Sequence, residues 1–191
     1  MEPISKEWTQ SWAAERGFRV SADGPMRLSY ESTSRGKRAT LLIDSERTPS
    51  DLVLLANRIV RVESEDEDDQ LSDEDQVYLF WISESNIWDE MTEALASCAF
   101  AALTNTTGAL LDGRGFLLQP AESQIAVLLC LNAILFGWDV YVAPRSGSFL
   151  CHISHDQYID LCTRDPQALE MTLKRFEAWG VEFRSIDEDG K

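Results

Sequence analysis

The sequence lacks paired cysteines, long hydrophobic runs and a surplus of basic residues, and each absence excludes a class of protein. None of its four cysteines forms a Cys-x-x-Cys pair, which indicates free thiols in a reducing compartment instead of a disulfide scaffold. The longest apolar run, residues 125 to 136, is too short to cross a bilayer. The N-terminus shows no cationic region before an apolar stretch, so no signal peptide is expected. We therefore expect a cytoplasmic protein.

The charge is strongly acidic and unevenly distributed. The 191 residues carry 33 acidic and 17 basic side chains, giving a formal net charge of −16. Nine acids and no base fall within residues 63 to 76. Such a field repels nucleic-acid backbones and acidic membranes and favours a basic protein partner. Nucleic-acid and membrane binding are therefore not expected.

The apolar pattern predicts an α+β fold with two lobes. In residues 1 to 62 the order is helix, three strands and helix, and the turn residues between the strands favour an antiparallel meander. Residues 63 to 76 contain one apolar residue among fourteen and are expected to form an acidic linker or long loop. Residues 77 to 191 are expected to form a C-terminal mixed α/β lobe, and the two lobes can pack as one unit.

The C-terminal lobe carries clearer local patterns. Residues 77 to 82 predict a central strand, and Asn86 is expected to cap the helix that follows it. A helix from Pro120 to Phe136 is apolar nearly all round, which predicts a central position. Two strands then pair as a hairpin. Ser154 is expected to cap a helix that begins with His155 and Asp156, and a further helix follows Pro166.

Thiols and imidazoles concentrate near residue 150. Cys151, His152, His155 and Cys162 are the residue types that bind zinc or act as nucleophiles. On a strand, however, Cys151 and His152 point to opposite faces, and Cys162 continues the apolar stripe of Ile159. Buried packing residues are the favoured interpretation, and neither a metal nor another cofactor is expected.

The run Ser154-His155-Asp156 contains the residue types of a hydrolase triad. Triad members meet in space and seldom in sequence, and a serine cap with an acid in the first helical turn explains the run more simply. One enzymatic alternative stays open. It is a small hydrolase or transferase in which His155 works with Asp156, Asp139 or Cys151.

A candidate partner-binding rim lies around two tryptophans. Trp88 and Trp138 each lie beside the boundary of a predicted element, where an indole can bury its ring and still donate its N–H. Arg114 and Arg145 lie in nearby loops, and Asp139 follows Trp138 directly. These residue types are typical of interface anchors.

The second half of the chain, from about Val77, resembles a group of uncharacterised bacterial proteins. The shared features are an aromatic strand with a Trp-containing helix start (Trp81 to Trp88), a helix ending in Phe-Gly-Trp-Asp (Phe136 to Asp139) and a strand ending in Ser-His-Asp (Ser154 to Asp156). The resemblance implies no activity. Separately, the α-β-β-β-α order and acidic character of the chain resemble type III secretion chaperones.

These observations favour one function. We expect a non-enzymatic protein-binding protein of adaptor, immunity or chaperone type, which acts through an acidic surface on a basic protein partner. A homodimer is compatible with the sequence.

Overall fold

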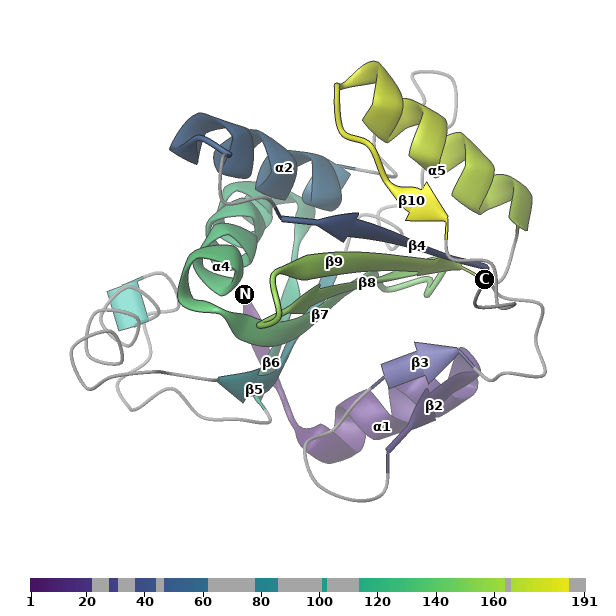
Figure 1. Ribbon diagram of the computed structural model, residues 1–191. Helices are drawn as coiled ribbons and strands as arrows, with labels where there is room; N and C mark the ends of the chain where they lie inside the picture. Colours follow the sequence, from purple (N-terminus) through teal and green to yellow (C-terminus); the bar gives the residue numbers. More distant parts are fainter. Residues whose placement is uncertain are drawn as a thin grey trace.

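A central antiparallel sheet organises the computed structural model (Figure 1), which describes residues 1–21, 28–30, 37–43, 47–61, 78–85, 101–102, 114–163 and 166–185. The sheet has eight strands in the order β1-β6-β5-β7-β8-β9-β4-β10. They are β1 (Glu2–Ile4), β4 (Lys37–Leu42), β5 (Tyr78–Ser85), β6 (Arg114–Leu118), β7 (Trp138–Pro144), β8 (Phe149–Ser154), β9 (Tyr158–Thr163) and β10 (Arg184–Ser185).

Helices cover both faces of this sheet, so the predicted α+β class is confirmed. On one face lie α2 (Pro49–Arg61), α4 (Ser123–Phe136) and α5 (Pro166–Ala178). On the other face lie α1 (Lys6–Glu15) and a separate two-stranded sheet of β2 (Phe18–Val20) and β3 (Leu28–Tyr30). A short 3₁₀ turn, η1 (Pro120–Glu122), leads into α4. None of the helices in the described residues is long and apolar enough to span a membrane.

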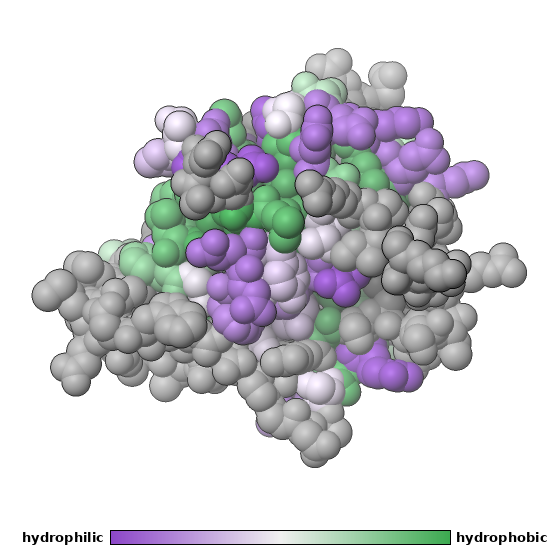
Figure 2. All heavy atoms as spheres, viewed as in Figure 1, coloured by the Kyte–Doolittle hydropathy of each residue, from purple (hydrophilic) through white to green (hydrophobic). Residues whose placement is uncertain are grey.

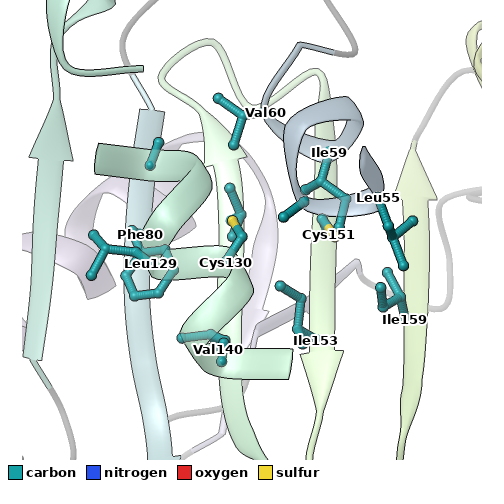
Figure 3. Close-up of a cluster of buried hydrophobic side chains, with 14 of the residues drawn as sticks. Leu55, Ile59, Val60, Phe80, Leu129, Cys130, Val140, Cys151, Ile153 and Ile159 are labelled. Atoms are coloured by element: carbon teal, nitrogen blue, oxygen red, sulfur yellow. The ribbon is translucent and has the colours of Figure 1, made fainter. Parts of the chain in front are cut away.

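The larger core lies between the sheet and the helices α2, α4 and α5. Because side chains alternate along a strand, Val140, Val142, Cys151, Ile153 and Ile159 all point to this face. They pack against the buried residues of α2 and α4, as Figure 3 shows for Leu55, Ile59, Leu129 and Cys130.

Among the described residues, the elements on the opposite face of the sheet cover only part of it. Trp12 and Phe18 pack over Leu79, Trp81 and Leu150, and the covering elements are α1 and the β2–β3 sheet. Gly115 lies beneath this cluster, where a Cβ atom would come within 2.5 Å of the Trp81 ring. Farther along the same face, towards β9 and β4, the row of side chains becomes polar. These polar side chains form the candidate site described below.

Local sequence chemistry explains several helix ends. The Ser5 hydroxyl accepts a hydrogen bond from the Trp8 amide at 3.1 Å and caps α1. At α2 the Thr48 hydroxyl accepts a hydrogen bond from the Asp51 amide, and the Asp51 carboxylate accepts one of 2.9 Å from the Thr48 amide, which makes a reciprocal cap. Gly137 ends α4 with a left-handed φ of 64°.

The predicted N-terminal meander is wrong in its third strand. β2 and β3 pair as expected, but β4 does not join them and instead pairs with β9 on one side and β10 on the other. Leu41 on one face of β4 joins the larger core, while Thr40 on the other face is buried against Asp160 of β9. Leu42, on the same face as Thr40, is 59% exposed. Strands β1 and β4 from residues 1–62 therefore share one sheet with strands from residues 77–191.

Helix α4 is central but not fully enclosed. Ala126, Leu129, Cys130 and Ala133 are buried, as expected of an apolar helix. Leu128 and Leu135, in contrast, are 42% and 56% exposed. The predicted acidic segment, residues 63–76, and most of the helix predicted after Asn86 lie outside the described residues; Ala101 and Ala102 are helical.

Candidate functional site

A row of polar side chains crosses four strands on the partly covered face of the sheet. The strand register places His152 of β8 opposite Tyr141 of β7 and also opposite Asp160 of β9, while Asp160 lies opposite Thr40 of β4. Asp139, two residues before Tyr141, points to the same face. The side chains of Asp139, Asp160 and Thr40 are all buried. Burial is uncommon for a carboxylate, and each buried polar group requires a hydrogen-bond or charged partner.

Asp139 contacts two histidines. Its Oδ2 atom lies 2.7 Å from Nδ1 of His155, and its Oδ1 atom accepts a hydrogen bond of 3.1 Å from the His155 amide. The same Oδ1 atom lies 3.4 Å from Nε2 of His152. One buried carboxylate thus holds both histidines of the chain and fixes the turn between β8 and β9.

Asp160 extends the site towards β4. It accepts hydrogen bonds of 2.5 Å from both Arg38 and Thr40, and its Oδ2 atom lies 4.0 Å from Nδ1 of His152. The His152 ring stacks on Tyr141 with 4.6 Å between ring centroids, so the ring plane is fixed.

Hydrogen bonding controls the ionisation of Asp139. Desolvation alone would raise its pKa, but hydrogen bonds from the His152 ring, the His155 amide and the His155 ring outweigh this effect and lower the pKa to about 2. At Arg38, burial opposes the charge, while the hydrogen bond and the charge of Asp160 raise the pKa of the guanidinium. Asp139 is therefore a carboxylate throughout the physiological range.

The helix predicted after Ser154 is wrong. His155, Asp156 and Gln157 form a tight turn with Gln157 at a φ of 62°, and residues 158 to 163 form strand β9. The Ser154 hydroxyl accepts from the Asp156 amide at 3.3 Å, so serine stabilises a turn here and caps no helix. His155 consequently does not flank a helix start, since its ring is held by a carboxylate.

Cys130 and Cys151 lie on the opposite side of the sheet from His152, whereas Cys162 lies on the same face as His152. The expectation that Cys162 continues the apolar stripe of Ile159 is therefore wrong, because residues 158 to 163 form a strand on which positions 159 and 162 point to opposite faces. Cys151 points to the helix-covered face, opposite to His152, as the strand pattern predicted, and burial raises the pKa of its thiol well above the ordinary value. Burial also raises the pKa of Cys130 and of Cys162 to about 12. Cys151 therefore cannot act with His155 as a nucleophile. No cluster of metal-ligating side chains occurs within the described part of the chain.

The structure describes the side chains of three residues of the predicted binding rim, namely Trp138, Asp139 and Arg145. Trp138 is fully buried and stacks on Phe136, so it presents no surface to a partner. The carbonyl of Arg145 accepts hydrogen bonds from Trp12 and Arg16, which anchors the turn between β7 and β8 to α1. Trp88 and the side chain of Arg114 lie outside what the structure describes. Asp139 is buried in the polar row and is not part of an exposed rim.

Sequence reasoning missed Asp160, Arg38 and Thr40 and assigned His152 to packing. A usable signal existed in residues 158 to 163, where Tyr158, Asp160 and Cys162 alternate with apolar residues at the period of a strand. No local sequence signal indicated the partners of Asp160, because Arg38 and Thr40 lie 122 and 120 positions earlier in the chain.

Two motifs that define the resemblance noted above meet at this site. The aspartate that ends Phe-Gly-Trp-Asp binds the histidine of Ser-His-Asp. Comparison of the chain with protein-family models, with curated proteins and with solved structures finds no match. The chemistry of the residues themselves therefore has to support any functional conclusion.

Proposed function

We propose that this protein is a non-enzymatic binding protein of adaptor, immunity or chaperone type, whose negative charge attracts a basic protein partner. The observation that carries the proposal is how the charge is divided along the chain. Residues 1 to 62 carry ten basic and eight acidic side chains, whereas residues 63 to 76 carry nine acidic side chains and no basic one. This separation supports an attraction of partners that is independent of the buried polar row.

Removing the acidic surplus is expected to abolish most of this attraction. In the test variant the nine acids from Glu63 to Asp75 are replaced by the matching amides. Its affinity for a fluorescent lysine-rich peptide should fall about tenfold or more at about 0.05 M salt, and both proteins should bind weakly at about 0.5 M salt. Fluorescence anisotropy measures the dissociation constants. A dissociation constant that changes neither with salt concentration nor with the substitutions would contradict an electrostatic role.

A second candidate function rests on one distance. The 2.7 Å contact between Asp139 and Nδ1 of His155 is the arrangement in which a buried carboxylate orients an imidazole that acts as general base. The other ring nitrogen, Nε2, lies 3.3 Å from Asp156, whose side chain is exposed. This geometry favours a small hydrolase or transferase that uses His155 to activate water or a substrate hydroxyl.

Replacing His155 with glutamine tests the second candidate. Glutamine keeps a polar side chain near Asp139 but has no titratable nitrogen, so a general-base activity should fall by about 10² to 10⁴-fold. The measurement is hydrolysis of a panel of chromogenic ester and phosphoester substrates by wild type and variant. Equal background rates for both proteins would remove the enzymatic alternative.

A further inference from the structure

The two oxygens of the Asp139 carboxylate receive different donors. Oδ2 lies 2.7 Å from Nδ1 of His155, whereas Oδ1 accepts from the His155 amide at 3.1 Å and lies 3.4 Å from Nε2 of His152. A carboxylate is planar, so the donors that hold Oδ1 also set the direction in which Oδ2 points. One carboxylate thereby joins the orientation of His155 to the position of His152.

The charge of Asp139 determines which nitrogen of His155 carries a proton. Hydrogen bonds lower the pKa of Asp139 to about 2, so near neutral pH its carboxylate is ionised and can only accept. Nδ1 of His155 must then be the donor in the 2.7 Å contact. In the neutral ring the other nitrogen, Nε2, is left with a lone pair, which a general base requires.

The unprotonated nitrogen lies on the solvent side of the turn between β8 and β9. Nε2 of His155 lies 3.3 Å from Oδ1 of Asp156, whose side chain is 68% exposed, while Asp139 on the other side of the ring is buried. Figure 2 shows hydrophilic side chains at the surface over this turn. Nε2 therefore faces the side from which water or a substrate hydroxyl would arrive.

His152 is held in place from the two neighbouring strands. Its ring stacks on Tyr141 of β7 with 13° between the ring planes, and it meets the Tyr158 ring of β9 edge-on, with 5.9 Å between the centroids. Its Nδ1 lies 4.0 Å from the buried carboxylate of Asp160, to which Arg38 donates a hydrogen bond. These contacts leave Nε2 of His152 directed at Asp139.

Two further observations support a role for His152 at this carboxylate. Among the hydrogen bonds that lower the pKa of Asp139, the one from the His152 ring has the largest effect. In addition, the pairing of β5 with β7 shifts register between Ile82 and Glu84, directly opposite Val140 and Asp139. Such β-bulges are common next to functional sites, where they change the direction of a side chain.

We propose that His152 is a positioning residue, which holds Asp139 so that Asp139 keeps His155 in the form with a proton on Nδ1 and an unprotonated Nε2. The proposal rests on the second candidate function, in which His155 is the general base. There the O–H bond of a water molecule or substrate hydroxyl breaks, its proton moves to Nε2 of His155, and the electron pair stays on the oxygen, which becomes the nucleophile. The proton on Nδ1 remains on His155, and the Asp139 carboxylate stabilises the positive charge that the ring gains.

Two substitutions of His152 separate positioning from packing. His152→Phe keeps a flat ring against Tyr141 but removes the N–H that faces Asp139. His152→Gln removes the ring but keeps an amide N–H that can donate to Asp139 from nearly the same place. The pKa of Asp139, measured by NMR of the carboxyl carbon in the whole protein, should rise from about 2 to about 3 or higher in His152→Phe and remain at about 2 in His152→Gln.

NMR of the ring nitrogens of His155, at about pH 8, gives a second reading of the same proteins. In the wild type and in His152→Gln, Nδ1 should give the signal of a protonated nitrogen and Nε2 that of an unprotonated one. In His152→Phe the two signals should shift towards each other, because Asp139 is held less firmly and the two neutral forms of the ring mix. Circular dichroism verifies that both variants are folded.

Unchanged Asp139 and His155 signals in His152→Phe would overturn the proposal. A larger change in His152→Gln than in His152→Phe would also overturn it, since that order indicates a packing role for the ring. The wild type alone gives a third test, because an unprotonated Nδ1 in His155 contradicts the assignment without any substitution. The NMR signals do not depend on turnover, so an inactive wild type in the hydrolysis assay would remove the general-base function, whereas the NMR outcomes decide the positioning by His152.

Discussion

Replacing Asp139 with asparagine is expected to lower the free energy of unfolding by about 2 kcal/mol at pH 7. The carboxylate is buried and receives hydrogen bonds from both histidines, which lower its pKa from 3.8 to about 2. A depressed pKa means that the ionised form stabilises the folded state. This stabilisation is complete above pH 4 and is lost as the pH falls towards 2.

The pH dependence distinguishes this effect from general damage. Urea unfolding between pH 7 and pH 3 measures the free energy of unfolding of the wild type and of Asp139→Asn. The difference between the two proteins should narrow to about half at pH 3, since the wild-type carboxylate then begins to be protonated. Asp156→Asn is the matched control, because its exposed side chain also lies near His155, and it should change stability by less than about 0.5 kcal/mol. A gap of constant size at every pH would contradict an ionic role for Asp139.

Replacing Trp81 with alanine is expected to cost about 3 to 5 kcal/mol of stability. Trp81 is fully buried on β5, beneath the cluster that α1 and the β2–β3 sheet form with the main sheet. Gly115 lies against its ring, so the site has no side chain on β6 that could fill the cavity. Thermal and urea unfolding measure the loss.

Phenylalanine at position 81 separates packing from hydrogen bonding. The indole Nε1 of Trp81 has no hydrogen-bond partner among the described residues. Trp81→Phe should therefore cost clearly less than Trp81→Ala, because it keeps most of the apolar volume and removes a buried donor that gains little from folding. Equal losses for the two variants would indicate that the indole N–H has a partner and that the ring volume is not the main contribution.

Much of the local structure was predictable because its causes are local. The caps at Ser5 and Thr48, the stop at Gly137 and the hairpin of β7 and β8 each depend on residues only a few positions apart. The error at β9 has a local cause as well. Ser154 and Gln157 fit a helix cap, and the same residues fit a turn in which Gln157 adopts a positive φ.

The candidate site was less predictable because its contacts are distant in sequence. The contact between Asp139 and His155 spans 16 residues and joins two short motifs, but neither motif alone indicates the other. The contact of Thr40 with Asp160 spans 120 residues, and it depends on β4 leaving the expected meander to pair with β9. Strand order in a sheet is a tertiary property, which a single sequence specifies only weakly.

The position of β4 also affects how the chain reaches its native state. β9 pairs with β4, which precedes it by about 120 residues, so the sheet can close only after a large loop has formed. Topologies dominated by such distant pairings fold slowly. Until β4 docks, β9 has an open edge whose backbone donors and acceptors can recruit strands of other molecules. Aggregation during synthesis is thus the hazard that this strand order creates.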